Sequence, residues 1–282
     1  MTELKPKEQQ ALAAIKALMI DMDGVLWHGD KSIVDLPKLF QQLSDHGYDY
    51  ILATNNSTKS PKAYQEKLAS FGVQVASDKI LTSSLVAASY LRQRFASGPV
   101  FYIGEKGLAE ALTEADFSLL SAEEVLAGAE SPLVVVGLDR YITYSKLSAA
   151  SMLIAKGAQF IATNNDNSIP VELGLLPGAG AIIAAISTTT GKNPLVLGKP
   201  AASMFQEGLK RLQQEASACL MIGDRLETDV AGAKRLGILT ALVLSGVSQA
   251  ASFENPSSSS SKPDLVMQDI AEVVARLIQS RA

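Results

Sequence analysis

The sequence predicts an α/β protein with a doubly wound parallel sheet and a second, inserted α/β domain. The first reason is a repeated order of elements, in which a helix, a glycine and an apolar strand follow one another along the chain. Glycine suits the left-handed turn that commonly ends a helix, and strand–helix alternation is typical of a parallel sheet covered on both faces. The order is clearest where expected helices at residues 145–156, 179–190 and 227–236 precede Gly157, Gly191 and Gly237.

The second reason is the length of the middle of the chain. Residues 55–198 separate two polar motifs, and this interval is far too long for a connection within one sheet. We therefore expect residues 83–178 to form an inserted α/β domain, while residues 1–82 and 179–282 form the domain that carries the main sheet. The inserted domain has apolar strands of its own, expected at residues 100–103, 133–137 and 159–162.

The first strand of the main sheet ends in two acidic residues. The apolar run from Ala17 to Ile20 predicts a buried strand, and Asp21, Asp23 and Gly24 follow it. Side chains two residues apart on an extended backbone share a face, and open α/β sheets bind ligands at the carboxyl ends of their strands. Buried carboxylates are costly unless a cation or a substrate proton compensates them. A divalent metal with a carboxylate nucleophile would do so, although an isolated pair of acids also fits a solvated loop.

The elements around this strand follow in order. Residues 2–16 are polar and alanine-rich, and predict a short leader helix. Apolar residues at helical spacing predict a helix over residues 36–46, and a strand follows at residues 50–53. Ser60 and Pro61 suit the cap and first position of the next helix.

The far end of the chain predicts one further strand and helix. Residues 255–264, NPSSSSSKPD, have the composition of a solvated low-complexity loop. A strand at residues 264–267 and a helix from about Asp269 are expected to complete the main domain.

Composition excludes several classes of protein. The chain has 282 residues with a net charge of −4, which argues against broad binding to nucleic acid or membrane surfaces. Cys219 is the only cysteine, so an intrachain disulfide is impossible, and its apolar neighbours predict a small buried side chain. No apolar run reaches the roughly 18 residues that a membrane span needs. Lys16 interrupts the one stretch that resembles a signal peptide, so we expect a cytoplasmic protein.

Three further polar motifs follow later apolar runs in a fixed order. They are ATNNST at residues 53–58, GKP at 198–200 and IGDRLETD at 222–229. With the acidic pair, these motifs make the chain resemble the haloacid dehalogenase (HAD) superfamily. More narrowly, it resembles subfamily IIA, the branch of small-molecule phosphatases that includes the NagD, 4-nitrophenylphosphatase and phosphoglycolate phosphatase types. The resemblance covers residues 17 to about 247, and implies a Rossmann-like core with a C2-type cap inserted between the second and third motifs.

The resemblance implies catalytic roles for the acidic pair. Asp21 is expected to be the nucleophile that forms an aspartyl-phosphate, which water then hydrolyses. Asp23 is expected to protonate the leaving oxygen and then to activate the water. Haloacid dehalogenases proper lack an acid at the position of Asp23 and need no metal, so its presence favours phosphoryl transfer.

The resemblance also implies a Mg²⁺ site. Mg²⁺ takes oxygen ligands and bridges to phosphate, which separates the nucleophile from the anionic substrate. The expected ligands are Asp21, the backbone carbonyl of Asp23, and Asp224. Asp229 is expected to orient metal-bound water, although an acid near a helix N-terminus is also favourable in its own right.

Phosphate contacts are expected from the second and third motifs. Thr54 supplies a hydroxyl, Asn55 a backbone N–H, and Lys199 a fixed positive charge. A lysine before proline at a strand end is usually solvated, and only the order of the motifs gives Lys199 a catalytic role.

Selectivity is expected to come from the inserted domain, because the core motifs contact only phosphate and metal. The loop TNNDNS, residues 163–168, follows an apolar run and is dense in groups that form hydrogen bonds. We expect Asn164, Asn165 and Asp166 to face the leaving group, although a solvated turn has the same composition. Similar enzymes often have proline or arginine at the position of Asn165.

The predicted function is Mg²⁺-dependent hydrolysis of small-molecule phosphate monoesters. A phosphotransferase or mutase would use the same motifs, and a non-catalytic protein that binds phosphorylated metabolites is a third possibility. Release of inorganic phosphate from an aryl phosphate distinguishes the hydrolase from both. The sequence does not identify the substrate among sugar phosphates, phosphoglycolate, nucleotides and pyridoxal phosphate. A homodimer formed through the cap is a further expectation.

Overall fold

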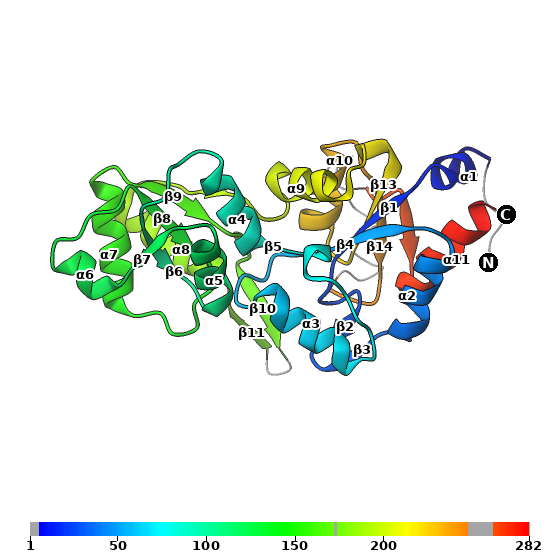
Figure 1. The fold of residues 1–282 in the computed structure, drawn as a ribbon, viewed down its shortest axis with the longest axis horizontal. Helices are drawn as coiled ribbons and strands as arrows, with labels where there is room; N and C mark the ends of the chain where they lie inside the picture. The colour runs from blue at the N-terminus through cyan, green and yellow to red at the C-terminus, as the bar shows by residue number, and fades with distance from the viewer. Residues whose placement is uncertain (1–5, 172–173, 248–261, 282) are drawn as a thin grey trace. The chain divides into compact units, whose positions relative to one another are not determined.

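The computed structural model describes residues 6–171, 174–247 and 262–281. The internal contacts divide the chain into two compact units (Figure 1). The first unit comprises Met1–Thr54, Gln65–Leu81 and Met204–Ala282, and the second comprises Asn55–Tyr64 and Thr82–Ser203.

The first unit contains a six-stranded sheet in the order β15-β14-β13-β1-β4-β5. The pairings of β1 with β13 and β4, and of β14 with β13 and β15, are parallel. Every residue of β1 is buried, and Ile20 at its end pairs with Ile222 of β13 and Leu52 of β4. The residues that follow these three strands therefore lie at the same edge of the sheet. The strands are β1 (Ala17–Ile20), β4 (Asp49–Thr54), β5 (Ile80–Thr82), β13 (Cys219–Gly223), β14 (Leu239–Val243) and β15 (Leu265–Met267).

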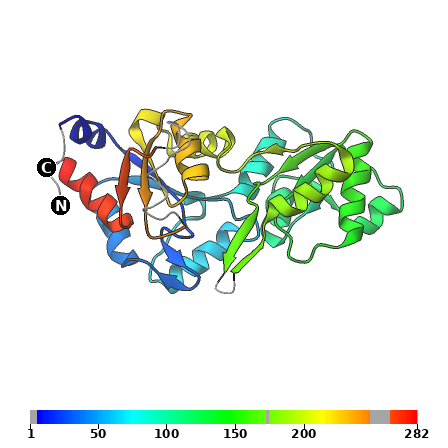
Figure 2. The ribbon, with the colours of Figure 1, turned by 180° about the vertical axis from the view of Figure 1, so that it is seen from behind.

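Three helices of this unit pack together. Helix α11 (Ile270–Ser280) contacts α1 (Pro6–Ala13) and α2 (Leu36–Asp45), as both ribbon views show (Figures 1 and 2). Asp269 caps α11 by accepting a hydrogen bond from the backbone N–H of Glu272, which explains why this helix begins where it does. The other elements are the β2–β3 hairpin (Trp27–His28 and Lys31–Ser32), α3 (Pro61–Ser70), short 3-10 turns at Ser77–Lys79 and Ala216–Ala218, α9 (Ala202–Leu212), a π-helical turn (Leu226–Val230) and α10 (Ala231–Lys234).

The second unit contains its own five-stranded sheet in the order β12-β9-β8-β6-β7. The pairings of β12 with β9, β9 with β8, β8 with β6, and β6 with β7 are all parallel, and a separate antiparallel hairpin joins β10 to β11. Its strands are β6 (Pro99–Ile103), β7 (Ser118–Leu120), β8 (Leu133–Val136), β9 (Gln159–Ala162), β10 (Ser168–Val171), β11 (Gly174–Pro177) and β12 (Leu195–Val196). Its helices are α4 (Ser83–Arg92), α5 (Lys106–Glu114), α6 (Ala122–Leu126), α7 (Tyr144–Ala155) and α8 (Ala179–Thr190).

The predicted α/β fold class is confirmed, and so are the glycine-terminated helices. Gly157, Gly191 and Gly237 all have positive φ, which is the left-handed turn expected after a helix. Cys219 is buried, and desolvation raises the pKa of its thiol to about 12, in keeping with a small apolar side chain. Most of the predicted Ser-rich loop, and the start of the leader helix, lie outside the described residues.

The second unit extends beyond residue 178, where the inserted domain was expected to end. Helix α8 buries Ile182, Ile183 and Ile186 in one hydrophobic cluster with Val134 of β8, and β12 pairs with β9. The apolar face of α8 is therefore part of the second core rather than the first. Helical periodicity shows that this face is buried, but it does not show against which sheet.

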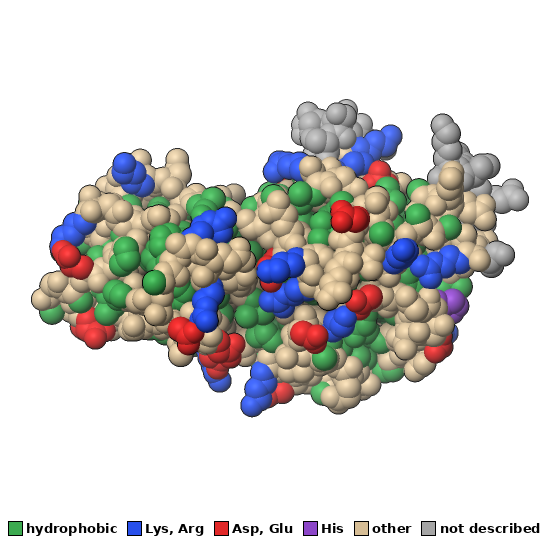
Figure 3. Space-filling model, turned by 45° about the horizontal axis from the view of Figure 1, so that its top comes forward, with side chains coloured by type: hydrophobic (Ala, Val, Ile, Leu, Met, Phe, Trp, Pro, Cys, Tyr) green, Lys and Arg blue, Asp and Glu red, His purple; other side chains and the backbone are tan. Residues whose placement is uncertain are grey.

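The charged surface agrees with the composition. On the face drawn in Figure 3, basic and acidic side chains are interspersed, in keeping with a net charge of only −4. Among the described residues, no helix combines the length and apolar character needed to cross a membrane.

Candidate active site

Three buried aspartates meet at the carboxyl edge of the first unit's sheet. Asp21 directly follows β1 and Asp224 directly follows β13, so the parallel register of these strands brings them together. Asp229 reaches the same place from the π-helical turn, and one carboxylate oxygen from each residue lies within 4.8 Å of the others. Their exposed fractions are only 8%, 0% and 0%. This cluster contains three of the four predicted metal-site residues.

Two glycines make room for Asp224. Gly24 has φ +87°, and a Cβ atom on it would lie 2.5 Å from Asp224 Oδ2. A Cβ atom on Gly246 would lie 2.0 Å from the same oxygen. The backbone N–H of Val247 donates to Asp224 Oδ2 at 2.7 Å, and the Ser245 hydroxyl donates to the carbonyl of Gly24 at 2.8 Å. A second loop, residues 245–247, thus holds the central carboxylate in place.

Asp229 is held by its own turn. The backbone N–H of Arg225 donates to Asp229 Oδ2 at 3.2 Å, and the N–H of Asp229 donates to the carbonyl of Arg225 at 3.1 Å. A Cβ atom on Gly223 would lie 2.4 Å from the Asp229 carboxyl carbon, so glycine is required where β13 ends. These contacts hold the Asp229 carboxylate beside those of Asp21 and Asp224.

The donor set fits a hard divalent cation such as Mg²⁺. All three side chains offer carboxylate oxygens, which are the ligands that Mg²⁺ prefers. Three buried negative charges at this separation repel one another and are poorly solvated, so a cation at the cluster would relieve a large electrostatic cost.

Addition of Mg²⁺ to metal-free protein is expected to raise the melting temperature. An ion that binds only the folded state stabilises it by about 2.7 kcal/mol at a hundredfold excess over its Kd. Differential scanning fluorimetry with and without Mg²⁺ measures the shift. Asp224→Asn should lose most of it, whereas Asp30→Asn, which changes an exposed acid of the same unit, should keep it. An equal shift in wild type and Asp224→Asn would place the ion elsewhere.

Asp23 differs from the buried cluster because it is exposed. Its Oδ1 accepts a hydrogen bond of 2.8 Å from the indole N–H of Trp27. Thr54, the last residue of β4, is buried at the same edge of the sheet, with 3% of its surface exposed. The first unit thus contains Asp21, Asp23, Thr54 and the two later acids of the prediction.

The second unit contains the other predicted residues, and several of them bind one another. The side-chain amide of Asn55 donates to the carbonyl of Lys199 at 2.9 Å and to the carboxylate of Asp166 at 3.2 and 3.3 Å. The side-chain amide of Asn164 donates to the carbonyl of Asn55 at 2.8 Å. Lys199 itself is buried, with 3% exposed. Four residues from three distant segments therefore form one hydrogen-bonded group.

In the loop that was expected to select substrates, the side chain of Asn164 is buried and bonds to the loop's own backbone. Asn164 is 4% exposed, and its Oδ1 accepts a hydrogen bond from the backbone N–H of Asp166 at 3.1 Å. Asn165 is exposed, and Asp166 is half-buried. The carbonyl of Asp166 accepts a hydrogen bond from the N–H of Gly180 at 2.9 Å, which joins the loop to the start of α8. Asn165 and Asp166 are therefore better placed than Asn164 to meet a ligand.

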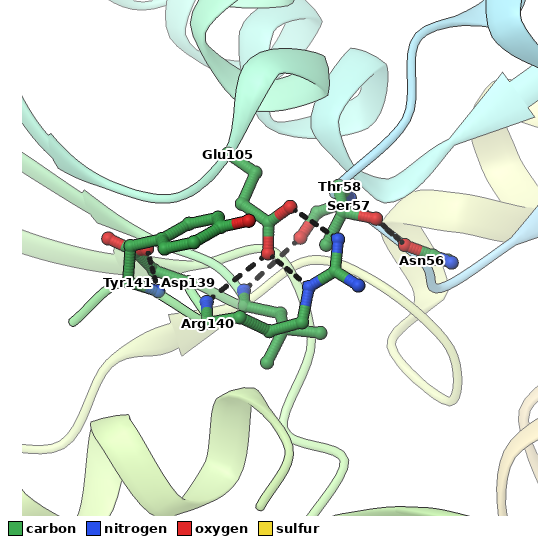
Figure 4. A network of polar contacts seen from close by, with 8 residues as sticks. Asn56, Ser57, Thr58, Glu105, Asp139, Arg140 and Tyr141 are labelled. Atoms are coloured by element: carbon green, nitrogen blue, oxygen red, sulfur yellow. Dashed lines mark hydrogen bonds and ion pairs between the residues drawn. The ribbon is translucent and has the colours of Figure 1, made fainter. Parts of the chain in front are cut away.

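A polar network of the second unit fixes the segment after Asn55 (Figure 4). Ser57 Oγ accepts a hydrogen bond of 3.3 Å from the N–H of Leu138, and Thr58 donates to the side chain of Asn56. Beside them, Arg140 forms a bidentate ion pair with Glu105, at 2.8 and 2.7 Å. Hydrogen bonding from Arg140 lowers the pKa of the Glu105 carboxyl, so this pair stays charged through the neutral range.

Two features of the site were missed by the sequence analysis. The first is loop 245–247, whose signal was a Ser-Gly pair directly after the apolar run of β14. The second is the bond from Trp27 to Asp23. Three residues lie between Asp23 and Trp27, and they form a turn that begins at Gly24. Neither helical nor strand spacing predicts that the two side chains meet across such a turn.

Several known proteins are similar to this chain over most of its length. The family described as haloacid dehalogenase-like hydrolase matches residues 18–118, and a family described as HAD-hydrolase-like matches residues 196–273. An acid sugar phosphatase of Staphylococcus epidermidis is 36% identical over 93% of this chain and 98% of its own. The crystal structure of a 4-nitrophenylphosphatase from Thermotoga maritima aligns with a TM-score of 0.87 and 30% identity, over 94% of this chain and 98% of that one.

A magnesium-bound relative supports the cation fit. The crystal structure of glycerol phosphate phosphatase from Mycobacterium tuberculosis in complex with magnesium has a TM-score of 0.83 and 30% identity, and the match covers 94% of this chain and 77% of that one. The family and the cofactor predicted from the four motifs are thereby confirmed. The chain belongs to the haloacid dehalogenase-like hydrolases.

Proposed function

We propose that this chain hydrolyses small-molecule phosphate monoesters with Mg²⁺, and that Asp21 is the nucleophile. The observation that carries the proposal is the cluster of Asp21, Asp224 and Asp229 at the carboxyl edge of a parallel sheet. Open α/β sheets bind their ligands at this edge. The similar proteins named above are phosphatases, and one of their structures holds magnesium.

In the first step, an Asp21 carboxylate oxygen attacks phosphorus. The bond from phosphorus to the leaving oxygen breaks as the new bond forms, and Asp23 gives its proton to that oxygen. In the second step, Asp23 takes a proton from water as the water attacks phosphorus. The bond from phosphorus to Asp21 then breaks, so inorganic phosphate leaves and both aspartates return to their first state.

Asp21, Asp224 and Asp229, with the backbone carbonyl of Asp23, would hold the Mg²⁺ ion. When bound, the ion would neutralise negative charge shared by the nucleophile and the phosphate. Asp224 is fixed for this task by Val247 and by the two glycines against it.

Thr54, Asn55 and Lys199 are proposed to bind the phosphate. The Thr54 hydroxyl and the Asn55 backbone N–H would donate to phosphate oxygens, and the Lys199 ammonium would balance their charge. The side-chain amide of Asn55 has a separate task, because it joins Lys199 to Asp166.

Residues 83–178 are proposed to act as a cap that selects substrates through Asn165 and Asp166, with Asn164 holding their loop in place. Support comes from the second sheet of this region and from the hydrogen bond between Asp166 and Asn55. A homodimer and a cytoplasmic location are further proposals, which size-exclusion chromatography with light scattering and cell fractionation would test.

A phosphate-release screen with Mg²⁺ tests the function directly. The panel should include 4-nitrophenyl phosphate, sugar phosphates, glycerol phosphate, phosphoglycolate, nucleoside monophosphates and pyridoxal phosphate. We expect turnover of 4-nitrophenyl phosphate and of at least one metabolite, with loss of both on chelation. Binding without release of phosphate from any ester would contradict a hydrolase.

Alanine substitutions in the cap loop are expected to distinguish residues that select substrates from residues that stabilise the loop. Asn165→Ala and Asp166→Ala should change relative rates across the panel several-fold without changing Mg²⁺ dependence. Asn164→Ala should instead lower stability by about 1–3 kcal/mol, because it leaves buried partners without a hydrogen bond. Asn193→Ala, at an exposed asparagine of the same unit, is the matched control. Unchanged relative rates in both loop variants would place selectivity elsewhere.

A further inference from the structure

The indole of Trp27 is a hydrogen-bond partner of the exposed Asp23. Trp27 is fully buried, whereas Asp23 is exposed, and the indole N–H donates to Asp23 Oδ1 at 2.8 Å. An indole N–H can only donate, so the oxygen that faces it must act as an acceptor.

Two side chains hold the indole ring. Phe71 stacks on it with ring centroids 5.9 Å apart. The ammonium of Lys67 lies 4.4 Å from the ring centroid, and it also donates to the carbonyl of Gly29 at 2.7 Å. Stacking and a cation above the ring face are both favourable contacts for an indole. The ring is therefore fixed by contacts that do not involve Asp23.

The backbone returns Trp27 to Asp23 through a tight turn. Gly24 has a positive φ, and its N–H donates to the carbonyl of Trp27 at 2.9 Å. Asp23 and Trp27 also form an isolated β-bridge. The donor and the acceptor are thus held together by main chain as well as by side chains.

We infer that Trp27 is a positioning residue for Asp23, and that it directs the transferable proton to Asp23 Oδ2. The inference rests on the proposed function, in which Asp23 is the general acid. A carboxylic acid with Oδ1 accepting from the indole carries its proton on Oδ2. The same bond persists after the proton has left, because a carboxylate oxygen also accepts. Trp27 therefore fixes the carboxyl group in both steps of the reaction.

This role has a signature that a purely structural tryptophan lacks. An alkyl phosphate releases a strongly basic alkoxide and needs the acid, whereas 4-nitrophenyl phosphate releases a weakly basic phenolate and does not. The ratio kcat/KM reports the step in which the ester bond breaks, even when hydrolysis of the phosphorylated enzyme limits kcat. Loss of positioning should therefore lower kcat/KM for the alkyl ester selectively.

Trp27→Phe is the decisive variant, because it keeps an aromatic ring and removes the N–H donor. We expect kcat/KM for glycerol phosphate to fall ~10- to 100-fold, which is part of the ~10²- to 10⁴-fold that general acid catalysis contributes. For 4-nitrophenyl phosphate the fall should be less than ~3-fold, because little acid assistance is at stake. Asp23→Asn should cause a larger loss of kcat/KM with the same preference for the alkyl ester. In a double variant, Trp27→Phe should add little to the loss that Asp23→Asn causes alone.

Phe71→Leu is the matched control, since it disturbs the packing of the indole but leaves the N–H in place. It should lower the melting temperature at least as much as Trp27→Phe, with the ratio between the two substrates unchanged. An equal loss on both substrates in Trp27→Phe, or the same selective loss in Phe71→Leu, would overturn the inference. A wild-type protein that hydrolyses neither ester would instead refute the proposed function.

Discussion

Replacement of Asp21 by asparagine is expected to abolish phosphate release, by ~10⁴-fold or more, because an amide is not a nucleophile toward phosphorus. The change preserves size and shape, so the fold should survive. It also removes one of three clustered negative charges, so the metal-free variant should melt at the same temperature as wild type or higher. Phosphate release from 4-nitrophenyl phosphate and a thermal melt without Mg²⁺ measure the two effects.

Asp30→Asn is the control for this experiment, since it changes an exposed acid in the loop that follows the same strand. Its activity and stability should match those of wild type. An Asp21→Asn protein that retains near wild-type turnover would show that another residue attacks the phosphate.

Replacement of Lys199 by methionine is expected to reduce turnover ~10²- to 10³-fold, the usual effect of removing one group that stabilises developing charge. Methionine fills most of the volume of the buried lysine stem but carries no charge. The bond between Asn55 and residue 199 should persist, because it uses the backbone carbonyl. The melting temperature should therefore change little, as measured alongside steady-state kinetics.

Lys192→Met serves as the matched control, because Lys192 is exposed in the same unit. A large drop in melting temperature with only a modest kinetic loss in Lys199→Met would make Lys199 a structural residue.

Part of this architecture follows directly from the sequence. The run from Ala17 to Ile20 is uniformly apolar and ends in acids, so a buried strand with a polar end was the natural interpretation. Parallel register then brings Asp21 to Asp224, although about two hundred residues separate them. The glycines that end the helices were predicted as readily, because a left-handed backbone conformation strongly favours glycine.

Other parts depend on contacts that no local pattern records. The apolar residues of α8 suit either sheet, and only the folded chain shows that they pack on the second. The burial of Asn164 was missed because a polar loop composition does not distinguish groups that face solvent from groups that bind backbone. The role of Trp27 was also missed, because its indole meets Asp23 across a turn that has no regular spacing.

The hydrogen bond between Asn55 and Asp166 constrains any attempt to redesign the substrate range. One amide serves both Asp166, in the loop expected to read the leaving group, and the carbonyl of Lys199. In a library randomised only at residues 163–168, a change at Asp166 would also disturb Asn55 and Lys199, which are proposed to bind the phosphate. Most active variants would therefore retain Asp166, whatever substrate they prefer. We therefore expect substitutions at positions 55 and 166 to be non-additive, so the two positions should be varied together.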